Sequence, residues 1–224
     1  MSEYRVNKRI NKDIEYYGFK FRTRRNFFDK KIIEEVLSGR TNYFLPENPK
    51  IIIDIGANIG AFSLLAAKAG AEVYAFEPEK FNYEVLCHNV EINGYSNRIH
   101  SINLGVGASG EAKLYLHEKN SGAPSSYLTT SRDLEELKYQ TVNFISIHDV
   151  FNHYKIDYCD VLKLDCEGSE KDIIGDLDNI LFDKIEQIDV EFHGLGKWLR
   201  RKLRRWYKKE EGTGHPKLWV FKKI

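Results

Sequence analysis

The sequence contains few cysteines, few prolines and almost no net charge. Its three cysteines, Cys87, Cys159 and Cys166, are an odd number without CxxC spacing, which argues against a disulfide framework or a zinc site. No run approaches the roughly 18 apolar residues of a membrane span, and residues 1–30 lack the apolar stretch of a signal peptide. The net charge of +1 excludes a global polycation or polyanion. These absences predict a cytoplasmic protein without a membrane span.

The composition is that of a globular protein whose charge is unevenly distributed. With 224 residues, of which 42% are hydrophobic, the chain has enough apolar material for one sizeable core. It is neither collagen-like nor disordered in composition. Residues 41–196 carry 12 basic and 25 acidic side chains, whereas residues 197–209 carry 8 basic side chains and no acidic one. A basic segment therefore follows an acidic middle.

The spacing of apolar residues divides the chain into two parts. Residues 1–48 are expected to form an N-terminal α+β extension that includes a helix at Asp29–Leu37. Residues 49–224 alternate between short apolar strands and amphipathic helices, which predicts an α/β fold with a doubly wound, mostly parallel, Rossmann-like sheet. The expected strands are 51–55, 72–76, 99–104, 112–117, 160–165, 185–192 and a closing strand 217–223. Four helices are expected in this part: one that begins at Ile59, two over 83–90 and 173–181, and a basic one over 196–209. Residues 118–140 are expected to form a loop.

The turn after the first long strand reads DIGANIG, from Asp54 to Gly60. Its glycines allow a tight turn and a close approach of a ligand, and a helix start at Ile59 presents free N–H groups. The GxGxxG fingerprint of nicotinamide enzymes is broken, because Asn58 stands where its second glycine would be. The D-x-G-x-x-x-G form is instead typical of S-adenosylmethionine enzymes. A glycine-rich turn without a ligand is the alternative.

An acidic residue stands where such a cofactor needs one. Glu77 ends the second strand, 21 residues after Gly56, so that its carboxylate could accept both ribose hydroxyls. The residues predicted to bind S-adenosylmethionine are Asp54, Gly56, Ala57, Asn58, Gly60, Glu77 and Asp165.

A second group of ionisable residues follows two later strands. Lys163, Asp165 and Glu167 alternate with apolar residues, so they share one face, and Glu191 and His193 share a face at the end of the next strand. We assign Lys163, Asp165, Glu191 and His193 as candidate catalytic residues, with Glu191 or His193 as the base. A buried ion pair of Lys163 and a capping role of His193 are the structural alternatives. The spacing is not diagnostic of metal binding, so no metal is predicted.

These motifs resemble the FkbM family of S-adenosylmethionine-dependent methyltransferases. The resemblance covers roughly residues 45–195 and rests on DIGANIG, on Phe76-Glu77-Pro78, on residues 162–170 (LKLDCEGSE), and on Glu191-Phe192-His193. It implies a class I methyltransferase fold, O-methylation of sugar or metabolite hydroxyls, and a place for Asp165 near the methyl group. The fold normally closes with a hairpin of two strands, but only one strand is evident here, so the first hairpin strand is expected to be missing or very short.

The kind of acceptor atom that receives the methyl group can be narrowed by excluding amine and carbon acceptors. The five prolines exclude the Asn/Asp-Pro-Pro-Tyr/Phe turn common in exocyclic-amine methyltransferases, and alternation directs Cys166 away from the face of Asp165, which argues against carbon methylation. An O-methyltransferase acting on a carbohydrate or small-molecule hydroxyl is therefore the leading hypothesis. An RNA ribose methyltransferase and a non-enzymatic membrane or scaffold module are the alternatives.

The basic segment 197–209 has two interpretations. Its apolar residues recur at helical spacing among arginines and lysines, so it could contact an anionic lipid surface or nucleic-acid phosphates. The preferred interpretation is a packing helix whose long basic side chains cover the acidic domain. The sequence makes no prediction about oligomeric state.

Overall fold

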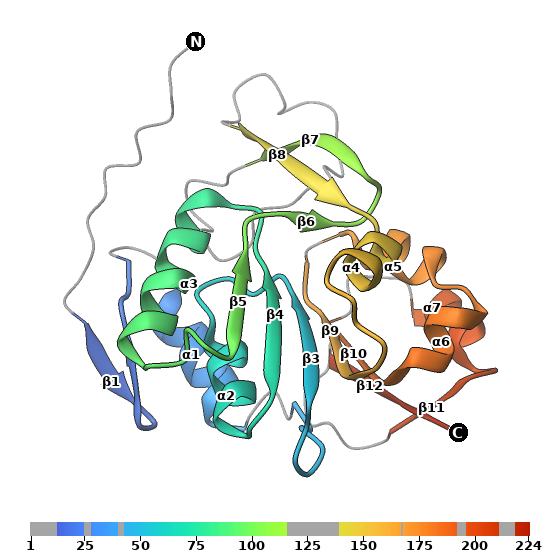
Figure 1. Cartoon of the computed structure of the whole chain (residues 1–224), viewed down its shortest axis with the longest axis horizontal. Coiled ribbons are helices and arrows are strands. Elements are labelled where there is room, and N and C mark those ends of the chain that lie inside the picture. Colours follow the sequence, from blue (N-terminus) through green and yellow to red (C-terminus); the bar gives the residue numbers. More distant parts are fainter. Residues whose placement is uncertain are drawn as a thin grey trace.

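The chain folds as a three-layer α/β structure around one large sheet (Figure 1). This computed structural model describes residues 13–24, 28–39, 43–115, 139–166, 168–191, 196–210 and 218–224. The strands are β1 (Ile14–Tyr16), β2 (Phe19–Phe21), β3 (Ile51–Ile55), β4 (Glu72–Phe76), β5 (Ile99–Ile102), β6 (Gly105–Val106), β7 (Gly110–Tyr115), β8 (Tyr139–Ile145), β9 (Cys159–Leu164), β10 (Ile185–Glu191), β11 (Tyr207–Lys209) and β12 (Leu218–Lys223). The helices are α1 (Asp29–Leu37), α2 (Ala61–Lys68), α3 (Lys80–Ile92), α4 (Ile147–His153), α5 (Glu170–Asp176), α6 (Asn179–Lys184) and α7 (Gly196–Leu203).

The large sheet has the order β11-β12-β10-β9-β3-β4-β5. Pairing is parallel from β10 to β5, whereas β12 is antiparallel to both β10 and β11. The carboxyl ends of the parallel strands therefore share one edge, which is where such sheets bind ligands. The predicted doubly wound parallel sheet is confirmed.

Two apolar cores cover the two faces of this sheet. Alternation along β3 sends Ile52 into the core under α1, α2 and α3, and Ile53 and Ile55 into the core under α4, α5 and α6. Because both faces are covered, β3 is apolar at every position except Asp54.

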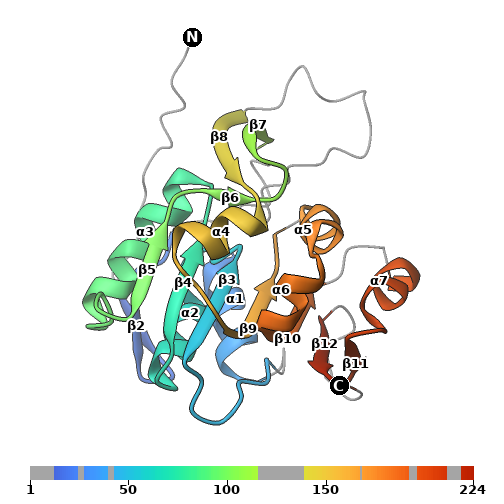
Figure 2. The same ribbon diagram turned by 45° about the vertical axis from the view of Figure 1, so that its right-hand side comes forward.

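A smaller sheet of β6, β8 and β7 stands beyond the carboxyl edge of the large one, as Figures 1 and 2 show. Gly105 of β6 lies directly under the ring of Phe144 in β8, where a Cβ would come within 2.5 Å of the ring. Neither β8 nor α4 was expected from the sequence. Ser146 and Asp149 form a capping box at the start of α4, and this spacing could have revealed the helix.

Several predicted boundaries are wrong. The basic helix 196–209 ends at Leu203, and 207–209 form the strand β11 instead. With three residues, this first hairpin strand is very short, which is one of the two outcomes expected for it. The stretch 173–181 is two helices rather than one, because α5 ends before Leu177 and Asp178 caps α6. The helix expected from Ile59 begins at Ala61. Of the loop expected at 118–140, only 139 and 140 lie among the described residues, and they begin β8.

The N-terminal extension is joined to the main domain by a buried arginine. The Arg24 guanidinium donates to both carboxylate oxygens of Asp29, at 3.1 Å from Nε and 2.6 Å from Nη2, and to the side-chain oxygen of Asn82 in α3. Arg24 and Asp29 are fully buried as an ion pair. Removing one member of such a pair leaves an uncompensated charge in the interior.

We expect Arg24→Ala to lower the free energy of unfolding by about 3–5 kcal/mol, as is typical for one broken member of a buried pair. Arg22→Ala is the matched control, because its pair with Asp13 is partly exposed, and such pairs contribute about 0–1 kcal/mol. Urea unfolding measures both, and equal losses would contradict a linking role for Arg24.

Candidate functional site

The DIGANIG loop is built against the end of β9. Gly56 has φ of +79°, and a Cβ there would lie 1.9 Å from the backbone oxygen of Asp165. The glycine is therefore required by the close approach of two protein segments and by its left-handed backbone. Asn58 (φ +51°) and Gly60 (φ +89°) complete the turn into α2.

The backbone N–H groups of the loop are largely used inside the protein. Gly56 and Ala57 both donate to the carbonyl of Phe76 at 3.0 Å, and Gly60 donates to the carbonyl of Ala57. Asn58 donates to Glu77 Oε2 at 2.8 Å. A pyrophosphate binds through backbone donors of such a loop, so this arrangement favours a ligand without one.

Asp54 and Lys163 form a buried ion pair beneath the loop. Lys163 Nζ lies 2.9 Å from Asp54 Oδ1, 3.3 Å from the Gly56 carbonyl and 3.8 Å from Asp165 Oδ2, and Ser63 Oγ donates to Asp54 Oδ2 at 2.6 Å. Burial by itself lowers the pKa of Lys163, but the nearby carboxylates of Asp54 and Asp165 raise it by a larger amount. The pKa of Lys163 therefore lies above its usual value, and the ammonium stays charged. Asp54 is fully buried and lines neither of the cavities described below.

Glu77 lies at the end of β4 with both carboxylate oxygens engaged. Its Oε1 accepts from the Glu79 N–H at 2.9 Å and from Asn82 Nδ2 at 3.2 Å, while Oε2 accepts from the Asn58 N–H. Oε2 therefore keeps one lone pair for a further donor. Burial raises the pKa of Glu77 to about 7, against the opposing effect of these hydrogen bonds.

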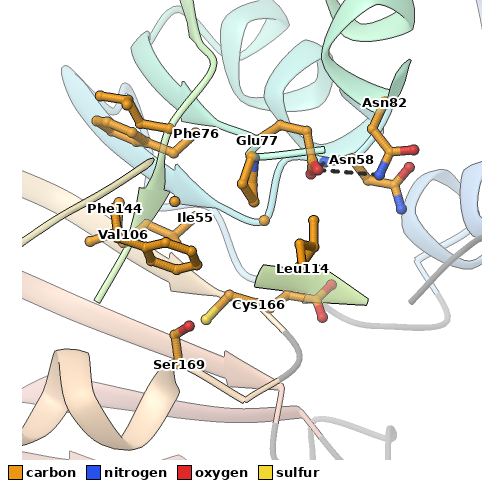
Figure 3. Close-up of a pocket in the computed structure, with 15 residues that line it drawn as sticks. Ile55, Asn58, Phe76, Glu77, Asn82, Val106, Leu114, Phe144, Cys166 and Ser169 are labelled. Atoms are coloured by element: carbon orange, nitrogen blue, oxygen red, sulfur yellow. Dashed lines mark hydrogen bonds between the residues drawn. The ribbon is translucent and has the colours of Figure 1, made fainter. Parts of the chain in front are cut away.

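A first cavity opens beside Glu77 (Figure 3). Its walls come from the ends of β3, β4 and β9 and from the small sheet, whose Leu114 and Phe144 face it. The cavity volume is about 60 Å³, well below the ~300 Å³ of a typical small-molecule site. A nucleoside-sized ligand would therefore displace side chains such as Leu114 on entry. Cys166 and Asp165 both line this cavity. The prediction that alternation directs Cys166 away from the face of Asp165 does not therefore keep Cys166 out of the cavity.

A second cavity of about 170 Å³ lies on the other side of the loop. Gly56, Asn58 and Asp165 line both cavities, so these three residues form a wall that the cavities share. The remaining walls of the second cavity include Glu191, Lys163, Tyr43, Phe62 and side chains of α1.

Tyr43 was not expected at the site, because it lies in the N-terminal extension. Its ring lies 4.8 Å from that of Phe62. Burial, and then the carboxylates of Asp165 and Glu191, raise the pKa of the Tyr43 hydroxyl well above its usual value, so this group stays protonated. No sequence motif marks Tyr43, since only the packing of the extension on α2 brings it to the rim.

The predicted site residues are thus partly brought together. Gly56, Asn58, Glu77 and Asp165 line the first cavity, and Lys163, Asp165 and Glu191 line the second. His193 and Glu167 lie outside the described residues. Within the described part of the chain, no three His, Cys, Asp or Glu side chains are grouped to hold a metal ion, and no helix has the length and apolar character of a bilayer span.

Comparisons with known proteins identify a family. The sequence profile of the Methyltransferase FkbM domain matches residues 54–209. The chain is 26% identical over 175 residues to the protein called Methyltransferase sdnD of Sordaria araneosa, a match that covers 66% of this chain and 67% of that protein.

Two solved structures from M. jannaschii are also similar. The tRNA m1G37 methyltransferase has a TM-score of 0.47 and 13% identity, and the match covers 97% of this chain but only 58% of that one. TYW2 in complex with AdoMet has a TM-score of 0.45 and 15% identity, with 98% and 89% covered.

We expect Lys163→Met to lower the free energy of unfolding by about 3–5 kcal/mol, because it removes the cationic partner of the buried Asp54 side chain. Lys184→Met is the control, since Lys184 pairs with the fully exposed Asp157 and should change stability by less than about 1 kcal/mol. Thermal and urea unfolding report the difference. A wild-type stability for Lys163→Met would show that the pair has no structural role.

Proposed function

Because the chain belongs to the FkbM methyltransferase domain family, we propose that it transfers the methyl group of S-adenosylmethionine to a hydroxyl oxygen of a carbohydrate or small-molecule metabolite. The observation that supports this most directly is that two cavities share Asp165 as a lining residue, and that Glu77 lines one of them and Glu191 the other.

The first cavity suits the nucleoside end of the donor. Glu77 offers the free lone pair of Oε2 to a ribose hydroxyl, and the apolar side chains of Ile55, Val106 and Leu114 suit an adenine ring. Asp165 then lies where the cationic end of the donor would reach, and its side chain is 29% exposed. The internal use of the loop N–H groups agrees with a donor that carries no pyrophosphate.

The second cavity suits the acceptor. When bound, the donor supplies an electrophilic methyl group, and the acceptor oxygen forms the new C–O bond as the S–C bond breaks. The protein orients the two groups and receives the hydroxyl proton. Lys163 cannot accept that proton, because its ammonium is held charged by Asp54. We therefore assign the base to Glu191 or His193, and a positioning role to Lys163.

The donor site gives a pH-dependent prediction. A ribose hydroxyl donates to the ionised form of Glu77, and this carboxyl titrates near pH 7 in the free protein. Affinity for S-adenosylhomocysteine should therefore rise as the pH increases from 6 to 8. Glu77→Gln should remove the pH dependence, and Glu77→Ala should weaken binding by about 10- to 100-fold, as expected for hydrogen bonds to a charged group.

Isothermal titration calorimetry measures these affinities, and Glu111→Gln, an exposed change on β7, is the control. Unchanged affinity in Glu77→Ala would argue against the donor assignment.

If Glu191 or His193 is the base, its substitution should lower turnover without weakening the binding of S-adenosylhomocysteine. Glu191→Gln or His193→Ala, whichever removes the base, should lower kcat by about 100-fold or more, with S-adenosylhomocysteine affinity nearly unchanged. Turnover is followed as S-adenosylhomocysteine release in a screen of sugars and hydroxylated metabolites. If both variants retain wild-type turnover, neither residue is the base.

A further inference from the structure

A third and larger cavity lies far from the carboxyl edge of the sheet. This basic cleft has a volume of about 790 Å³ and is formed between α6 and the segment 201–206. Arg201, Lys202, Arg204 and Arg205 line it together with Trp206. Trp206 accepts a backbone hydrogen bond from Ile224, next to the start of β10, so the cleft lies at the opposite end of β10 from Glu191. Figure 2 shows α7 at the right-hand side of the molecule, beyond α6.

Three arginines of the cleft form no ion pair with the acidic domain, among the residues that the structure describes. Arg201, Arg204 and Arg205 are exposed, and none of them forms an ion pair within the described part of the chain. Lys202 donates to the carbonyls of Gly175 and Leu177, which fixes it to the end of α5. The acidic residue in the cleft, Asp178, accepts from the Leu181 N–H to cap α6. The expectation that the basic side chains cover the acidic domain is therefore not supported for these three arginines.

The apolar side of α7 is not available to a lipid surface. Leu199 and Leu203 are buried in the core, 2% and 0% exposed, and Trp206 stacks on Phe182 with ring centroids 5.4 Å apart. Membrane adsorption by an amphipathic helix requires such a face to be free. What remains outside is a concave surface with three guanidinium groups on one side and Asp178, Asn179 and the exposed Ile180 on the other.

Arginine side chains lie next to aromatic rings in and beside the cleft. Within it, Arg205 lies 5.3 Å from the Trp206 ring, and outside it Arg200 lies 5.0 Å from the ring of Trp219. Arg201, Arg204 and Arg205 line the cleft itself, whereas Arg200 lies outside it, one residue before Arg201 on α7. A charged groove with aromatic side chains is what binds the backbone of a single nucleic-acid strand.

We propose that the basic cleft binds the phosphodiester backbone of a single-stranded nucleic acid. The cleft shares no lining residue with the donor or the acceptor cavity. This proposal can therefore be tested independently of the proposed methyl transfer.

The tryptophans provide a specific probe. All three tryptophans of the chain, Trp198, Trp206 and Trp219, lie on α7, just after it or on β12, so intrinsic tryptophan fluorescence reports on this region alone. Titration of the full chain with an unlabelled 12-nucleotide RNA should quench this fluorescence, and anisotropy of the same RNA carrying fluorescein gives the affinity. With about four phosphates neutralised, raising the salt from about 50 to about 200 mM should weaken binding about 50-fold.

The triple variant Arg201→Gln, Arg204→Gln, Arg205→Gln should weaken RNA binding at least about 10-fold and make the salt dependence shallower by about two units of slope. The control with the same charge change is Lys50→Gln, Lys113→Gln, Lys155→Gln, which removes exposed cations elsewhere and should bind as wild type. Circular dichroism verifies that both fold. Absence of RNA binding at low salt, equal loss in both variants, or binding to phosphatidylserine vesicles without RNA binding would each overturn the proposal.

Discussion

The site depends on one buried ion pair, between Lys163 of β9 and Asp54 of β3. A charged pair inside a parallel sheet is stable only when both partners and their remaining hydrogen-bonding groups are satisfied. Here Ser63 satisfies Asp54, and the Gly56 carbonyl accepts from Lys163. The pair therefore joins two strands, the first turn of α2 and the loop that follows β3. Gly56 adds a second link, since its lack of a side chain lets the loop rest on the Asp165 carbonyl.

Charge is separated along the length of β10. At its carboxyl end, Glu191 and Asp165 line a cavity with the protonated Tyr43 hydroxyl, whereas exposed arginines line the cleft near its amino end. The same strand carries Asp189, fully buried with one carboxylate oxygen that has no hydrogen-bond partner among the described residues. Burial raises the pKa of Asp189 to about 7. The carboxylates of Glu191 and Asp165 and the basic cleft thus lie at opposite ends of β10, with the buried Asp189 between them.

Predictions from the sequence were accurate where the spacing of apolar residues alone identified a helix or a strand. The strands 51–55 and 72–76 and the helix Asp29–Leu37 have the expected bounds, since burial on one or both faces leaves a clear apolar pattern. The predicted helix over 196–209 is too long because apolar residues at helical spacing, Trp206 and Tyr207, continue past Leu203. Tyr207 is buried instead as part of β11, with its hydroxyl donating to the Ile185 carbonyl. No local pattern distinguishes these outcomes, because the decision is made by contact with α6 and β12.

The sequence alone determined the class of the fold, the glycine-rich loop after β3, the position of Glu77 at the end of β4 and the grouping of Lys163, Asp165 and Glu191 near one edge. It did so because parallel strands place the residues that follow them at a common rim. Tertiary structure alone decided that Lys163 pairs with Asp54, that Tyr43 reaches the second cavity, and that the arginines after β10 line a cleft. These outcomes depend on contacts between segments far apart in the chain, about which spacing along the sequence carries no information.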